Sequence, residues 1–220
     1  MSDGPRVALT FDAEHPDRPH HGDHAAWVLD ELERLEVRAT VFIQGRWAEA
    51  YPDLARRCAQ VGHLVGSHTF YHARVSLFSE GGFETDLADA ERAIREITGV
   101  DPRPWLRFPF GDGADASEIV ARLPALGYRH IGWDLELFEW EAGCTAAELA
   151  ARAVDGVRAH GDGAIVLLHT WPDPVAPALS EMVTRLRDEG ARFVGVDELD
   201  LPAGLEPVAM PRPGEAVAAT

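Results

Sequence analysis

Short apolar runs alternate with amphipathic segments along most of the 220-residue chain. The runs are four to six residues long and are rich in valine, isoleucine and aromatic residues, which is typical of buried strands. We expect strands at 7–11, 39–43, 63–66, 105–108, 128–133, 164–168 and 192–196. Between them, apolar residues recur at the three- and four-residue spacing of helices. We expect helices at 25–36, 47–60, 83–98, 117–126, 145–160 and 177–190.

This alternation predicts an α/β fold with a parallel sheet, built as one domain over residues 1–200. A barrel and a doubly wound sheet both satisfy the pattern. Residues 201–220 carry several prolines and end in small residues, and we expect this tail to be poorly ordered.

The charge composition makes some classes of binding partner unfavourable. Lys and Arg number 20 against 37 Asp and Glu, a formal charge of −17, so nucleic acids and anionic membranes are unfavourable partners. No apolar run is long enough to span a membrane, and the residues before the first strand lack the basic and apolar regions of a signal peptide. We therefore expect a cytoplasmic protein. The two cysteines indicate no disulfide framework, and nothing in the sequence indicates an oligomeric state.

Two histidines follow the third expected strand four residues apart, at His68 and His72. On a helical turn such a pair shares one face and can hold one metal ion, and imidazole suits Zn²⁺, Co²⁺, Ni²⁺ or Fe²⁺. Asp12 or Glu14 could supply a third ligand, because residues two apart share one face of a strand and Ala13 then points away. A purely structural histidine pair is the alternative.

Further polar residues follow other expected strands, and in a parallel barrel all of these positions meet at one end. His169 stands alone after a buried strand and fits a general acid, and Arg107 could orient a carboxylate. Each residue alone has a structural explanation, as a cap, a core histidine or an ion pair. Their convergence favours an enzyme that hydrolyses an amide or ester with a metal-activated water. Four more histidines in the first loop fit a solvated loop, a substrate rim or an extra metal contact: His15, His20, His21 and His24.

The chain resembles the NodB-homology polysaccharide deacetylases, also called carbohydrate esterase family 4. Five motifs carry this resemblance in family order over about residues 6–200. They are Thr10-Phe11-Asp12-Ala13-Glu14, His68-Thr69-Phe70-Tyr71-His72, Arg107-Phe108-Pro109-Phe110-Gly111, the stretch from Trp133 to Trp140, and Leu167-Leu168-His169. The fourth looks like the family's Asp-x-x-Asp-Trp stretch with both aspartates replaced by glutamate.

The resemblance implies a distorted (β/α)7 barrel that binds a divalent metal, most often zinc. It implies that His68 and His72 bind the metal, that Asp12 is the general base and that His169 is the general acid. The supporting roles that it implies fall on residues from three motifs. Arg107 would position Asp12, the Phe110 N–H would bind the oxyanion, Trp140 and Leu167 would line the acetyl pocket, and Glu136, or alternatively Asp134, would tune His169.

Ala13 departs from the family, because it occupies the position of the family's third metal ligand and alanine cannot bind metal. Glu14 is our candidate replacement, and a weakened or absent metal site is the alternative. We therefore predict a metal-dependent hydrolase that removes an N- or O-acetyl group from an acetylated sugar, either a small molecule or an oligosaccharide. A hydrolase of cyclic or other small amides on the same barrel is one alternative. A non-catalytic carbohydrate-binding protein is the other.

Overall fold

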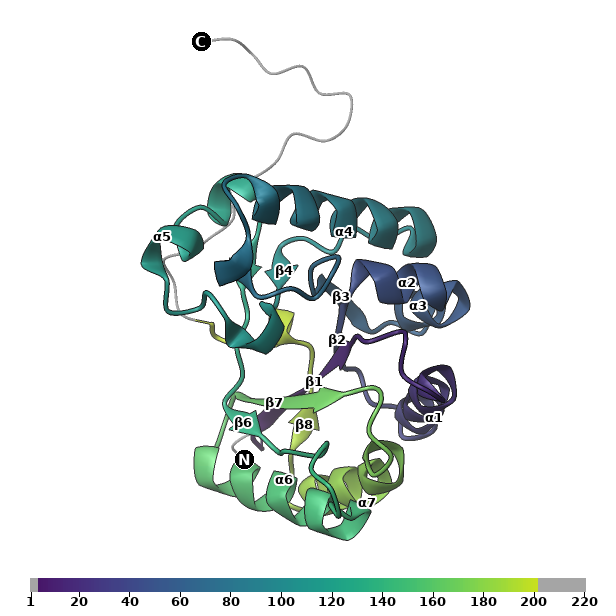
Figure 1. Cartoon of the computed structure of the whole chain (residues 1–220). Coiled ribbons are helices and arrows are strands. Elements are labelled where there is room, and N and C mark those ends of the chain that lie inside the picture. Colours follow the sequence, from purple (N-terminus) through teal and green to yellow (C-terminus); the bar gives the residue numbers. More distant parts are fainter. Residues whose placement is uncertain (1–3, 202–220) are drawn as a thin grey trace.

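The computed structural model describes residues 4–201 and shows a curled parallel sheet with helices on its outer side (Figure 1). The strands run in the order β5-β4-β3-β2-β1-β7-β6, and β8 pairs with β1. The strands are β1 (Arg6–Ala13), β2 (Thr40–Ile43), β3 (Leu64–Ser67), β4 (Trp105–Leu106), β5 (Arg129–His130), β6 (Leu135–Glu136), β7 (Ala164–His169) and β8 (Arg192–Phe193). All the pairings among them are parallel.

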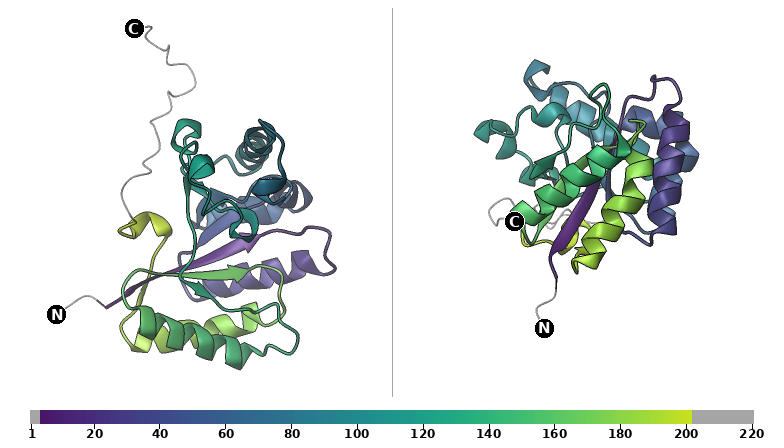
Figure 2. Two further views of the ribbon diagram at one scale, coloured as in Figure 1. Left: turned by 60° about the vertical axis from the view of Figure 1, so that its left-hand side comes forward. Right: turned by 90° about the horizontal axis from the view of Figure 1, so that it is seen from below.

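Seven α-helices connect the strands within the described residues and pack on the convex side of the sheet, as the two views of Figure 2 show. They are α1 (His21–Arg34), α2 (Gly45–Ala50), α3 (Pro52–Gln60), α4 (Gly82–Thr98), α5 (Ser117–Val120), α6 (Ala146–His160) and α7 (Val175–Asp188). Over residues 4–201, none of these helices has the length and apolar content needed to cross a membrane.

Side-chain alternation along β1 explains how the sheet divides the core. Leu9 and Phe11 point outward into a large cluster with the apolar faces of α1, α6 and α7. Ala8 points inward, where it packs with Phe42 and Ile165 in the interior of the curled sheet. Asp12 lies on the same inward face, two residues after the buried Thr10. The inward face of β1 is therefore apolar at Ala8 and polar at its carboxyl end, which lies at the mouth of the barrel.

A seam separates the two ends of the sheet, because β5 and β6 are the ends of the strand order and are consecutive in the chain. The chain crosses from one to the other through residues 131–134. Arg107 holds this crossing segment, since its guanidinium donates to the carbonyl oxygens of Ile131 at 3.2 Å and Gly132 at 2.9 Å. The sheet thus forms an incompletely closed barrel, which confirms the distorted (β/α)7 barrel and excludes the doubly wound alternative.

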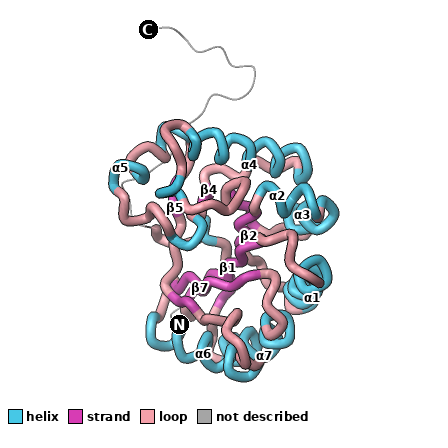
Figure 3. The backbone as a smooth tube through the Cα atoms, in the orientation of Figure 1, coloured by secondary structure: helices cyan, strands magenta, loops and turns pink. Residues whose placement is uncertain are grey.

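Several boundaries differ from those expected from the sequence. The helix expected over 47–60 is two helices, because the chain breaks at Tyr51 just before Pro52. The helix expected over 117–126 ends at Val120. Strand β6 was not expected, because two residues are too few to show the apolar alternation of a strand. The chain before and after it is loop (Figure 3). The expected tail, 201–220, lies outside the described residues except for Leu201.

Candidate active site

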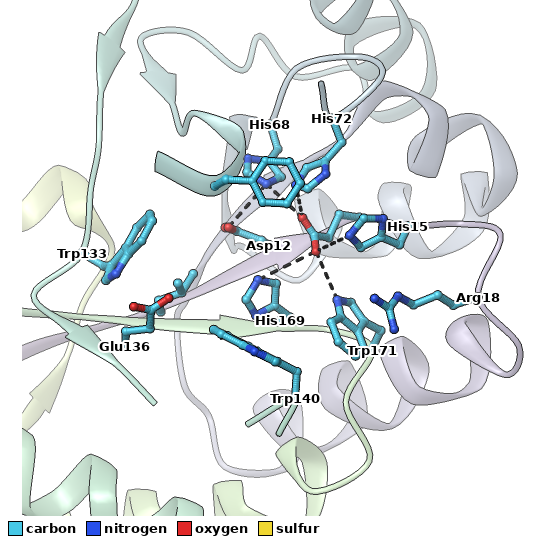
Figure 4. A pocket seen from close by; sticks show the side chains of 13 residues that line it. Asp12, His15, Arg18, His68, His72, Trp133, Glu136, Trp140, His169 and Trp171 are labelled. Atoms are coloured by element: carbon cyan, nitrogen blue, oxygen red, sulfur yellow. Dashed lines mark hydrogen bonds and ion pairs between the residues drawn. The ribbon is translucent and has the colours of Figure 1, made fainter. Parts of the chain in front are cut away.

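A cavity of about 340 Å³ opens at the carboxyl ends of the strands (Figure 4). Its walls come from all five motifs and from the loops that follow β1 and β7. The lining residues are Asp12, Glu14, His15, Arg18, His68, His72, Phe110, Trp133, Glu136, Trp140, Leu167, His169 and Trp171. The predicted convergence of polar residues at the barrel mouth is therefore found.

Glu14, His68 and His72 bring one donor atom each to within 4.8 Å of one another, and all three side chains are buried. Glu14 Oε2 lies 3.2 Å from His68 Nε2 and also contacts His72 Nε2. His68 Nδ1 lies 2.9 Å from the carbonyl oxygen of Arg107, which can only accept, so Nδ1 carries a proton and Nε2 is the ring atom directed at Glu14. Two imidazoles and one carboxylate are a donor set that fits a divalent ion such as zinc.

The two histidines lie on an irregular loop and not on the helical turn that their spacing suggested. Thr69 and His72 both have positive φ values, 61° and 58°, which brings the two rings together without a helix. Buried Asp86 fixes the loop by accepting the backbone N–H groups of Phe70 at 2.8 Å and Tyr71 at 3.1 Å. Gly45 is required beside it, because a Cβ atom there would collide with the Phe70 ring.

Glu14 and Asp12 both face the cavity, whereas Ala13 is buried in an apolar cluster with Ile43 and Trp47. This is the placement expected from strand alternation. The second oxygen of Glu14, Oε1, accepts from Trp171 Nε1 at 3.2 Å and lies 3.1 Å from His15 Nε2. Burial acts to raise the pKa of Glu14, but hydrogen bonds from His15, His68 and His72 outweigh it and hold that pKa well below its usual value. Glu14 is therefore a buried, ionised carboxylate.

Asp12 is held from one side by Arg107, whose Nη1 donates to Asp12 Oδ1 at 2.9 Å. The Arg107 side chain has no exposed surface, so this ion pair is shielded from water. The other oxygen, Asp12 Oδ2, lies 3.5 Å from His68 Nε2. One oxygen of Asp12 is thus fixed by the arginine, and the other is directed at the candidate metal ligands.

The carboxylate beside His169 belongs to Glu139, and the prediction of Glu136 or Asp134 for this position is wrong. Glu139 Oε1 accepts from both the backbone N–H and the Nδ1 of His169, each at 2.8 Å. Glu136 is an exposed residue of the cavity wall, and exposed Asp134 accepts the backbone N–H of Ile165 outside the cavity. A turn at Phe138, with a φ of 53°, reverses the strand alternation and moves Glu139 inward.

The remaining predicted residues fall on the cavity wall. Phe110 has a φ of 59°, and its ring lies 4.6 Å from that of His72. Trp140 stands edge-on to His169 with ring centres 5.0 Å apart, and Leu167 is buried. Of the loop histidines, His15 contacts Glu14 and lines the cavity. The other three do not line it: His20 is exposed, His21 is buried against Trp47, and His24 contacts the carbonyl of Trp171.

The sequence reasoning missed Glu139, Arg18 and Trp133. For Glu139 a signal was available, since it directly precedes Trp140 and so matches the second aspartate of the family's Asp-x-x-Asp-Trp stretch. Trp133 opens that same motif. Arg18 lies in a loop without periodicity, and no pattern distinguishes it from the other arginines.

Known proteins resemble this chain over most of its length. A family model described as polysaccharide deacetylase matches residues 2–131. The peptidoglycan-N-acetylmuramic acid deacetylase PdaA of Bacillus subtilis is 28% identical over 88% of this chain and 70% of its own length. The chitooligosaccharide deacetylase of Azorhizobium caulinodans is 30% identical over 79% of this chain and 77% of its own length.

A solved structure of T48 deacetylase with substrate has a TM-score of 0.74 at 29% identity, covering 88% of this chain and 89% of that one. The sequence, the family model and the fold therefore agree, and the resemblance seen in the five motifs is confirmed. Since the family model spans more than half of the chain, this protein belongs to the polysaccharide deacetylase family.

Proposed function

We propose that this protein is a metal-dependent deacetylase that hydrolyses the acetyl amide or ester of an acetylated sugar. The observation that carries the proposal is that Asp12 and His169 line the same cavity as the three candidate metal ligands, and that each has a buried charged partner. The deacetylase names of the relatives support the same reaction class. Zinc in this site, a cytoplasmic location and a small or oligosaccharide substrate stay predictions.

Glu14, His68 and His72 would hold the metal. A divalent ion in that position lowers the pKa of a water and polarises a carbonyl. Asp12, oriented by Arg107, accepts the proton of the attacking water. His169 Nε2 gives a proton to the departing nitrogen or oxygen, while Glu139 holds Nδ1 and stabilises the imidazolium. In this proposal the backbone N–H of Phe110 donates a hydrogen bond to the oxyanion. Trp140 and Leu167 surround the acetyl methyl group.

Acetate release tests this function. The protein is treated with a chelator, reloaded with zinc and incubated with a chitooligosaccharide, and the acetate formed is measured. We expect release by the zinc-loaded protein, loss after chelation and recovery on adding zinc. Zinc-loaded protein that releases no acetate from N- or O-acetylated sugars would overturn the proposal. Hydrolysis of ureides or imides would then identify an amide hydrolase, and sugar binding without turnover a binding protein.

Glu139→Gln is expected to move the alkaline limb of the pH–rate profile to lower pH. Burial acts to lower the pKa of His169, but the hydrogen bond and charge of Glu139, with the charges of Glu14 and Asp12, raise that pKa to about 9. The acid works only while protonated, so activity falls as pH rises through this pKa. Removing the charge of Glu139 should lower the midpoint by about 1 pH unit or more.

The matched control for Glu139→Gln is Glu136→Gln, which makes the same change on the wall of the same cavity. Glu136 has no hydrogen bond or ion pair with His169, so its variant should keep the alkaline midpoint of the parent. A shift in the Glu136 variant and none in the Glu139 variant would contradict the assignment of Glu139.

A further inference from the structure

Arg18 is the one lysine or arginine among the described residues that line the cavity. Its guanidinium carbon lies 3.6 Å from the centre of the Trp171 ring (Figure 4). Within residues 4–201 it forms no ion pair with a carboxylate, and the neighbouring Asp17 pairs instead with Arg46 at 3.3 Å. In a chain with a formal charge of −17, Arg18 therefore places a positive charge without an acidic partner at the cavity mouth.

The ring beneath Arg18 is itself fixed. Trp171 donates its indole N–H to Glu14 Oε1 at 3.2 Å, and its carbonyl oxygen lies 2.7 Å from His24 Nδ1 of α1. A guanidinium stacked on a fixed ring is held in one plane, and the N–H groups along its edge stay available. Those groups form a fork that matches a carboxylate, which accepts two parallel hydrogen bonds.

The cavity is polarised from one side to the other. Glu136 lies on the side opposite Arg18, as Figure 4 shows. Of the remaining acids, Asp12 is paired with Arg107, and Glu14 is surrounded by histidines. An anionic group on a bound molecule is therefore attracted to the Arg18 side and repelled from the Glu136 side.

A second cavity adjoins the first one at Arg18. This cavity of about 380 Å³ shares Arg18, Trp140 and Trp171 with the first, so Arg18 stands between the two. Glu141 and Asp173 line this second space and make it acidic. An anionic substituent of a bound molecule would therefore pair with Arg18 at the boundary between the two cavities. A group attached to that substituent could extend into the second cavity.

We propose that Arg18 is a specificity-determining residue that binds a carboxylate carried by the substrate. The substrate class is then an N-acetylated sugar with a carboxylate substituent near the acetamide, in preference to a neutral chitooligosaccharide. This inference rests on the proposed function, since it assigns the substrate of the same site.

The test compares two matched substrates, an oligosaccharide whose N-acetylated sugar carries a lactyl ether carboxylate and the same compound with that carboxylate converted to the neutral amide. We expect the parent to prefer the acid by about tenfold in kcat/KM, as for a charge-assisted hydrogen bond at an exposed site. Arg18→Gln should abolish most of this preference. Arg18→Lys should keep part of it, because the charge remains and the fork is lost.

Arg92→Gln is the control, since Arg92 is also an exposed arginine but lies on α4 and lines neither cavity, and it should keep the preference for the acid. An acid preference that is equal in the parent and in Arg18→Gln would overturn the inference, as would a parent without preference. If neither compound is hydrolysed, the proposed function fails. Calorimetric binding of acid and amide to the parent and to Arg18→Gln still decides the role of Arg18.

Discussion

Glu14→Ala is expected to lose nearly all of its bound divalent ion, while the parent protein holds about one ion per chain. Glu14 is the acidic member of the triad, and without it only two imidazoles remain. Such a pair is a weak site, because a mononuclear site generally needs three protein ligands. Elemental analysis of the purified proteins measures the loss. Acetate release should fall in parallel, by about 10²-fold or more.

Glu136→Ala is the matched control for Glu14→Ala, because Glu136 is a second glutamate of the same cavity and lies outside the triad. It should retain the ion. Zinc should raise the melting temperature of the parent and of Glu136→Ala but not that of Glu14→Ala, since only a bound ion stabilises the folded state. An ion retained after loss of Glu14 would contradict our assignment and point to Asp12 or His15, which lie within 3.5 Å and 3.1 Å of triad atoms.

Asp12→Asn is expected to lower kcat by about 10²–10⁴-fold, the usual contribution of a general base. Asparagine cannot accept the proton of the attacking water. Its side-chain oxygen can still accept the hydrogen bond from Arg107, so the buried arginine keeps a partner and the fold should be retained. Steady-state kinetics of acetate release measures the effect.

Metal analysis separates the two roles open to Asp12. If Asp12 is the base, Asp12→Asn keeps the ion and loses the rate. Loss of both would identify Asp12 as a ligand. Asp134→Asn makes the same chemical change on an exposed residue outside the cavity, and it should stay within a few-fold of the parent. A comparable loss of rate in that control would show that the effect at Asp12 is not specific to the site.

The parts of the site that follow strand periodicity could be predicted from the sequence. Alternation along the end of β1 places Asp12 and Glu14 in the cavity and Ala13 in the apolar layer. The alternation of strands and helices likewise predicted a parallel sheet with its polar residues at one end. These features depend only on a two-residue repeat and on the order of elements, and both can be read from a single chain.

The parts that depend on irregular backbone could not be predicted in this way. His68 and His72 meet because two loop residues have positive φ values, and not because a helix brings them together. Glu139 reaches His169 because the turn at Phe138 breaks the alternation that begins in β6. A positive φ at a non-glycine residue leaves no composition signal, so neither contact follows from spacing alone.

The order of the site residues along the chain has a consequence for how the site forms during folding. All three candidate metal ligands lie in the first 72 residues, just after β1 and just after β3, and these two strands both pair with β2. The partner of Asp12 comes later, at Arg107, and this side chain also holds the segment between β5 and β6 by its carbonyls at Ile131 and Gly132. His169 and Glu139 come later still. During synthesis, the three candidate metal ligands therefore emerge well before His169, the proposed acid, and the complete site can form only after β7 has paired with β1.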